Sequence, residues 1–137
     1  MKMIIDSNLL LILLVGLCDP DQIGRKKHTK EFCKDDFAVL CDALVGFESL
    51  CVTPNVATEC SNLICGRDNH GANACEAQML AKLFDEGHLY RLSEHYVESR
   101  AAVQRREYSY LGLGDCSLLH LVDARHAIIT EDNKLAD

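Results

Sequence analysis

With 137 residues, the chain is long enough for one domain with a substantial core and too short for two ordinary domains. Hydrophobic residues make up 48% of the sequence, which excludes an intrinsically disordered chain. The formal net charge of -7 excludes a general attraction to nucleic acid, so RNA binding would need a local basic patch or a metal ion.

The N-terminal third predicts one strand and two helices. Met3 to Ile5 is typical of a short buried strand, and a helix is expected from Asn8 to about Leu17 with Ser7 as its N-cap. A basic loop, Gly24 to Lys30, then precedes a second helix from about Glu31 to Val45.

The middle of the chain continues this alternation. Leu50 to Val52 predicts a second strand, after which Thr53 caps a helix with Pro54 at its first position. Three further elements are expected here: a helix over Ala74 to Phe84, a strand over His88 to Tyr90, and a helix capped by Ser93 that runs to about Arg106.

In the C-terminal third, Gly112 and Gly114 bracket a turn, Asp115 opens a helix, and Ala127 to Ile129 predicts a last strand. Short apolar strands that alternate with helices are typical of a parallel sheet covered on both faces. The sequence therefore predicts a single α/β domain over residues 1–137 with a central, mostly parallel sheet.

Eight cysteines raise the question of disulfides, zinc and cellular compartment. An export signal would have to use the apolar run Leu9 to Val15, which Asp6 and Asn8 precede and which is too short to span a bilayer. Zinc sites usually need tight cysteine pairs, and no C-x-x-C pair occurs. We therefore expect a cytoplasmic protein without disulfides, whose cysteines are mostly small buried hydrophobes.

Four acids occupy positions that favour metal chemistry. Asp6 and Asp132 follow predicted strands, where a parallel sheet forms its ligand crevice. Glu59 shares a helix face with apolar residues, and Asp115 opens a core helix. If the four converge, their mutual repulsion calls for a hard divalent cation, Mg²⁺ or Mn²⁺, which suits phosphodiester hydrolysis.

Each acid also has a plainer interpretation. Asp6 or Asp115 can act only as a helix cap, Glu59 can pair with Arg67, and Asp132 can be a turn residue. The basic loop offers Arg25, Lys26, Lys27 and Lys30 as phosphate contacts, or it is simply a solvated surface loop.

Four short strings resemble the motifs of the PIN-domain ribonuclease family, in the same order along the chain. They are Ile4 to Asn8 (IIDSN), Thr58 to Leu63 (TECSNL), Leu113 to Leu119 (LGDCSLL) and Ile129 to Leu135 (ITEDNKL). The resemblance implies a three-layer α/β/α Rossmann-like fold and a Mg²⁺- or Mn²⁺-dependent endoribonuclease. Asp6, Glu59, Asp115 and Asp132 would then be the catalytic, metal-binding acids, with Asn8 and Thr130 as supporting groups.

The resemblance also implies partners. Small PIN proteins of the VapC type are toxins held inactive by an antitoxin peptide, and others process RNA or act in defence. The chain stops where that family continues into another strand, so its last strand should be covered by a loop, an antitoxin-like partner or a second copy in a homodimer; the alternative is that further natural residues follow. Two other functions stay open: a non-catalytic PIN-like binding domain and a DNA-directed flap-type nuclease.

Overall fold

The computed structural model describes residues 3–45, 47, 50–65, 71–85, 87–122 and 127–129. Four strands, β1 (Met3–Ile5), β2 (Leu50–Val52), β3 (Leu92–Glu94) and β4 (Ala127–Ile129), form a small sheet in the order β3-β2-β1-β4. All of their pairings are parallel. Every residue of β1 and β2 is buried, as expected for strands of a sheet that is flanked by helices.

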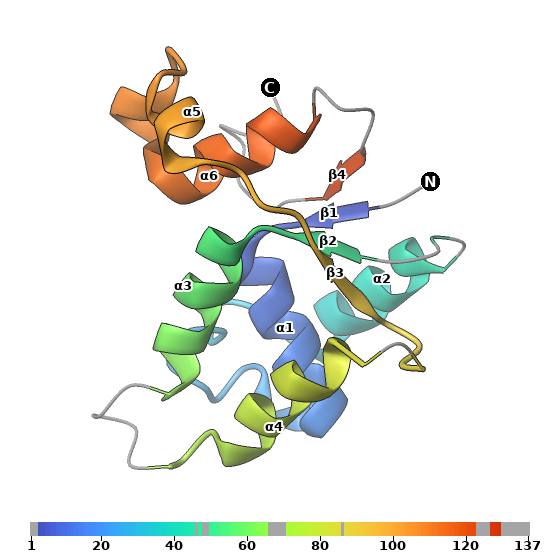
Figure 1. The fold of residues 1–137 in the computed structure, drawn as a ribbon. Helices are drawn as coiled ribbons and strands as arrows, with labels where there is room; N and C mark the ends of the chain where they lie inside the picture. Colours follow the sequence, from blue (N-terminus) through green and yellow to red (C-terminus); the bar gives the residue numbers. More distant parts are fainter. Residues whose placement is uncertain are drawn as a thin grey trace.

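The helices are α1 (Ser7–Cys18), the short 3-10 helix η1 (Pro20–Gln22), α2 (Lys34–Leu44), α3 (Pro54–Cys65), α4 (Ala74–Leu83), α5 (Ser99–Val103) and α6 (Tyr108–Val122). In the view of Figure 1, α1 to α4 gather below the sheet, and α5 and α6 lie above it. None of the helices in the described part of the chain is long and apolar enough to cross a bilayer. The predicted α/β class with a parallel sheet is confirmed.

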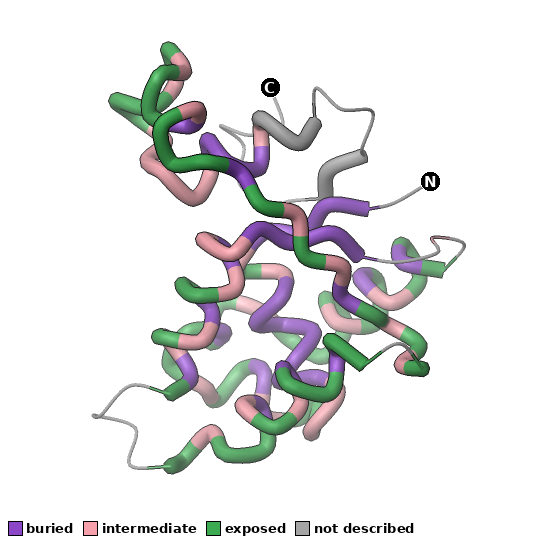
Figure 2. The backbone as a smooth tube through the Cα atoms, in the orientation of Figure 1, coloured by how far each residue is buried: buried purple, intermediate pink, exposed green. Residues whose placement is uncertain are grey.

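Helix α1 is the centre of the core. Its residues from Leu10 to Gly16 are all buried, and it packs against α2, α3 and α4. Figure 2 shows this buried stretch joining the buried strands β1 and β2. Gly16 permits the close approach of α2, because a Cβ at this position would overlap the ring of Phe37. Burial of each such leucine contributes roughly 1.5–3 kcal/mol to folding, so the buried run Leu10 to Val15 contributes strongly to stability.

One predicted helix start is confirmed and another is shifted, and local hydrogen bonds explain both. Helix α3 begins at Pro54, and the Thr53 hydroxyl accepts a hydrogen bond from the Val56 N–H at 3.3 Å. Helix α2 begins at Lys34 and not near Glu31, because the Asp36 carboxylate accepts the Cys33 N–H at 2.8 Å and so fixes the first turn there.

The prediction for the segment between α4 and α6 is wrong. The third strand is Leu92–Glu94, and Ser93 lies inside it instead of capping a helix. Sheet pairing decides this placement, because Leu92 aligns with Leu50 and is buried, whereas Leu89 is 82% exposed. Only the short helix α5 follows. Local propensity could not distinguish the two apolar runs, since the choice depends on which one reaches β2.

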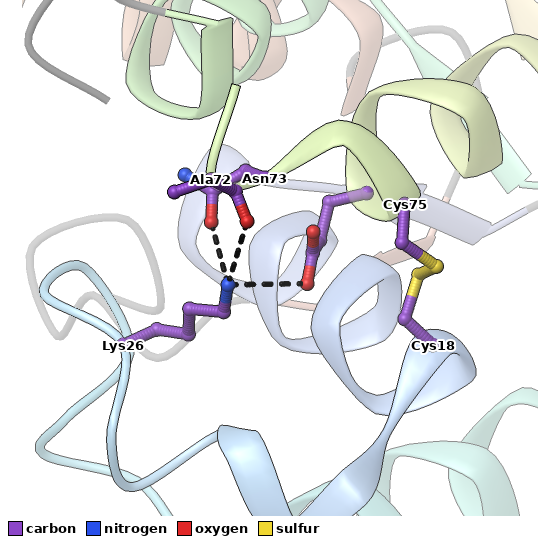
Figure 3. Close-up of a disulfide and its surroundings, with 6 residues drawn as sticks. Cys18, Lys26, Ala72, Asn73 and Cys75 are labelled. Atoms are coloured by element: carbon purple, nitrogen blue, oxygen red, sulfur yellow. Dashed lines mark hydrogen bonds and ion pairs between the residues drawn. A yellow bond between two sulfur atoms is a disulfide. The ribbon is translucent and has the colours of Figure 1, made fainter. Parts of the chain in front are cut away.

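The expectation of no disulfides is also wrong for this structure. Cys18, at the end of α1, is bonded to Cys75, in the first turn of α4, with 6.2 Å between their Cα atoms (Figure 3). The two cysteines are 57 residues apart in sequence, and the packing of α1 against α4 brings them together. Of the free cysteines, Cys51, Cys60 and Cys116 are buried as predicted for small hydrophobes. The prediction is wrong for Cys33 and Cys65, which are exposed, and Cys41 is half-buried.

Candidate functional site

Asp6 stands at the junction of β1 and α1. It is 5% exposed, and its Oδ1 accepts a hydrogen bond from the Leu9 N–H at 3.0 Å. Asp6, and not Ser7, is therefore the N-cap of α1. Capping engages one carboxylate oxygen with a backbone donor and fixes the side chain at the carboxyl end of β1.

Glu59 lies on α3 at the edge of the face that packs into the core. Val56, Cys60 and Ile64 form the buried face of this helix, and Glu59 is exposed. The apolar face predicted for this helix is present, but Glu59 lies at its border with an exposed side chain, while Cys60 beside it is buried. Burial, helped by the neighbouring Glu59 charge, raises the pKa of the Cys60 thiol to about 12, so this thiol stays protonated near neutral pH.

The start of α6 meets α3 beside Glu59. Gly112 adopts a φ of 84°, which breaks the helical run and lets it restart with Gly114 and Asp115 in the new first turn. Gly114 lies against the glutamate: a Cβ built there would stand 3.4 Å from the Glu59 Oε2. Since Asp115 is the next residue and is half-buried, Glu59 and Asp115 belong to one corner of the molecule.

A buried pair of hydroxyls holds this corner together. The Thr53 and Ser117 hydroxyl oxygens lie 2.9 Å apart, and the Ser117 hydroxyl donates to the Gly114 carbonyl at 2.6 Å. The pair joins the beginning of α3 to that of the restarted α6 across 64 residues of sequence. The sequence carried no signal for this pairing, because each residue is explained locally, Thr53 as a cap and Ser117 as a helix residue.

The predicted fourth acid, Asp132, and the supporting Thr130 lie outside the described residues. The strand before them is described, and its last residue, Ile129, pairs with Ile5, the residue before Asp6. The chain therefore leaves β1 and β4 at the same edge of the sheet. The predictions for all four acids as metal ligands stay predictions.

The donor chemistry around this edge suits a hard cation. Asp6, Glu59 and Asp115 offer carboxylate oxygens, and the nearby Cys60 is a protonated thiol and not a thiolate. Within the described ranges, no group of three or more histidine, cysteine, aspartate or glutamate side chains is positioned to hold a metal ion. Asp6, Glu59 and Asp115 all belong to the described residues, so the structure does not bring these three carboxylates together as a ligand group.

An open groove of about 580 Å³ runs along this corner, and we call it the α3–α6 groove. Helix α3, the link between β3 and α5, and the restart of α6 supply its walls. Its lining residues are Pro54, Asn55, Thr58, Glu59, Asn62, Leu63, Tyr96, Val97, Ser99, Leu113 and Gly114. Sequence reasoning identified Glu59 among them but missed Tyr96, which lies in a segment expected to be helical.

The predicted basic loop divides into two parts. The Lys26 ammonium group donates to Asn73 Oδ1 at 2.8 Å and to the Ala72 carbonyl at 3.3 Å, and it lies 3.8 Å from the buried Glu76 carboxylate (Figure 3). Lys26 thus anchors the start of α4. The prediction that it contacts RNA stays a prediction, but its charge already serves a contact within the protein.

The other part of the loop faces solvent. Arg25, Lys27 and Lys30 are exposed, and both lysines line a second groove of about 250 Å³ together with Asn8. We call it the Asn8 groove; His28, Glu31 and Phe32 complete its lining. Since Asn8 is two residues from Asp6, this groove begins close to the carboxyl end of β1.

The chain matches no protein-family model and no curated protein.

Proposed function

We propose that this protein is a metal-dependent endoribonuclease with a PIN-like, three-layer α/β/α Rossmann-like fold. The observation that carries the proposal is the place of Asp6 at the carboxyl end of β1, with β4 ending beside that strand. Asp6 follows β1, β4 ends beside β1 on the way to Asp132, and Glu59 lies against the turn that holds Asp115. Carboxyl ends of parallel strands are where such folds bind their ligands.

Asp6, Glu59, Asp115 and Asp132 are the residues that would hold Mg²⁺ or Mn²⁺. When bound, such a cation activates water and stabilises negative charge on a phosphodiester under attack. The protein's own contribution is positional: the Leu9 N–H holds Asp6 in place, and the Thr53–Ser117 pair holds the turn that carries Asp115. Asn8 and Thr130 are proposed to orient carboxylates or water.

The Asn8 groove supplies the attraction to RNA that the net charge of -7 does not. Lys27 and Lys30 are exposed beside Asn8, so a phosphate held there would lie near the chain segment that carries Asp6. A cytoplasmic toxin controlled by an antitoxin-like partner, or a defence or RNA-processing nuclease, is the role that the family resemblance favours.

A non-catalytic binding domain is the second candidate, and two observations favour it. Glu59 is exposed, and Asp6 has a sufficient structural role as the N-cap of α1. In that case the groove and the basic side chains would bind a nucleic acid or a protein without cleaving it.

The test is cleavage of single-stranded RNA and of single-stranded DNA with Mn²⁺, by the unaltered protein and by Asp6→Asn and Asp115→Asn. Asparagine caps helices as well as aspartate does, so Asp6→Asn removes the charge and keeps α1. We expect either variant to lose RNA cleavage by on the order of 100-fold or more, with an unchanged melting temperature.

The matched control is Asp19→Asn, which alters an N-cap of the same type at η1, at the far end of α1. It should cleave RNA normally. Undiminished cleavage by Asp6→Asn or Asp115→Asn would refute the metal site, cleavage of DNA alone would favour a flap-type nuclease, and RNA binding without cleavage would favour the non-catalytic domain.

A further inference from the structure

Tyr96 is a large aromatic side chain held at the surface by a fixed backbone. It lines the α3–α6 groove and is 76% exposed. On one side, the His95 N–H donates to the Val52 carbonyl at 2.8 Å, which ties the segment to the end of β2. On the other side, Val97 is buried in the core with 4% exposure. Tyr96 is therefore anchored through both neighbours while its ring remains accessible.

The other groove walls define the chemistry of a ligand. Glu59 carries the only charge among the described lining residues, so the groove does not attract phosphate. Asn55, Asn62 and Thr58 offer amide and hydroxyl groups that both donate and accept hydrogen bonds, and Leu63 and Leu113 supply apolar surface. This combination suits a flat, neutral ring with polar edges.

The size of the groove agrees with that chemistry. Its volume of about 580 Å³ lies within the roughly 300–1,000 Å³ that small-ligand sites occupy. Tyrosine stacks on every nucleobase, because each base has a π-face. In a duplex both faces and the pairing edge of a base are occupied, so only an unpaired base can enter such a site.

We infer that the α3–α6 groove binds one unstacked base of single-stranded RNA, which stacks on Tyr96. This inference rests on the proposed function and adds to it that the substrate must be single-stranded at the bound position. The base then lies beside Glu59 and the Gly114–Asp115 turn. Tyr96 is a binding residue. Because only an unpaired base can stack on it, Tyr96 selects single-stranded RNA as the strand that reaches the acids.

The chain contains no tryptophan, which permits a direct measurement. Tyr96→Trp keeps a stacking ring and introduces a single tryptophan as the fluorescent probe. Tyr110→Trp is the matched control, because Tyr110 is 59% exposed on α6 and does not line the groove. Each variant is titrated, without divalent metal, with a short oligouridylate and with the same strand paired in a duplex. We expect the single strand alone to quench the tryptophan fluorescence of Tyr96→Trp saturably, and the fluorescence of Tyr110→Trp to stay unchanged.

Binding and cleavage by the groove variants separate this inference from the proposed function. Tyr96→Ala should weaken binding of the single strand by about 5- to 150-fold, as expected for the loss of one stacked base, whereas Tyr96→Phe should bind normally. Equal quenching of Tyr96→Trp by the duplex, or unchanged binding by Tyr96→Ala in a protein that cleaves RNA, overturns the inference and leaves the nuclease proposal standing. Quenching of Tyr96→Trp by the single strand alone, in a protein that cleaves nothing, supports the inference and refutes the nuclease.

Discussion

The packing of α1 against α4 and the corner between α3 and α6 are built in different ways. In the first region, a disulfide joins the two helices, and Lys26 links the basic loop to Asn73 and the buried Glu76. In the second, the hydroxyls of Thr53 and Ser117 make the buried contact, and Glu59 and Tyr96 face an open groove. Charged groups are matched within the protein in the first region, whereas in the second region the charged and aromatic side chains that line the groove face outward.

This contrast separates stability from function. A charged group that is matched internally contributes to folding and has little left to offer a ligand, as for Lys26. A polar or aromatic group that lines an open groove contributes little to folding and remains available for binding, as for Glu59 and Tyr96. Substitutions in the first region should therefore lower stability, and those in the second should change binding.

The largest stability effect is expected from the disulfide. Replacing both Cys18 and Cys75 by serine should lower the free energy of unfolding by about 2–4 kcal/mol, because the cross-link restricts the unfolded chain over a 57-residue separation. Urea denaturation measures the change, and RNA binding at the α3–α6 corner should be unaltered. Cys65→Ser, at an exposed free cysteine, is the control and should be neutral. Mass spectrometry that finds every cysteine unbonded in the native protein would contradict the cross-link.

A smaller loss of stability is expected at Lys26. Lys26→Met keeps the side-chain length but leaves the Glu76 carboxylate, of which 5% is exposed, without its cation at 3.8 Å. Because the lysine side chain itself is 25% exposed, we expect about 1–2 kcal/mol and not the larger cost of a fully buried pair. The control is Lys27→Met at the exposed neighbour, which should stay within about 0.5 kcal/mol.

RNA affinity should show the opposite order for these two lysines. Lys27→Met should weaken binding and reduce its salt dependence, whereas Lys26→Met should leave both unchanged. Adding Glu76→Gln to Lys26→Met should recover part of the lost stability, since the uncompensated charge is then removed. If Lys26→Met weakened RNA binding more than Lys27→Met did, Lys26 would contact RNA in addition to its contacts within the protein, and the prediction would be wrong.

The smallest effect concerns Cys60, at the border between the core and the groove. Its folded pKa of about 12 lies above the ordinary value of 9.0, so the folded state holds the proton more tightly. That stabilisation is fully present below pH 9 and is lost as the pH rises toward 12. The loss of unfolding free energy at pH 9.5 is a little under 1 kcal/mol. Denaturation of the protein and of Cys60→Ala at pH 7 and 9.5 measures it. An equal alkaline loss in both would show that other groups are responsible.

Local sequence patterns predicted the elements whose formation depends only on residues close together in the chain. The strand Met3–Ile5, the strand Leu50–Val52 and the start of α3 at Pro54 all follow from apolar runs and a cap within a few residues. The same reasoning failed at β3, where two apolar runs were equally plausible and only pairing with β2 chose Leu92. It also missed that the Glu59 side chain, at the border of the apolar face of α3, is exposed.

The sequence by itself determined the α/β alternation, the buried helix α1 and the positions of Asp6 and Asp115 at the starts of helical segments. Only the tertiary structure decided that Cys18 meets Cys75, that Lys26 meets Glu76, and that Thr53 meets Ser117 across 64 residues. The physical reason is that hydrophobic periodicity and capping act within a few residues of the chain, whereas these contacts depend on how whole helices pack. Tyr96 belongs to the second group, because the β2–β3 pairing carries it to the groove.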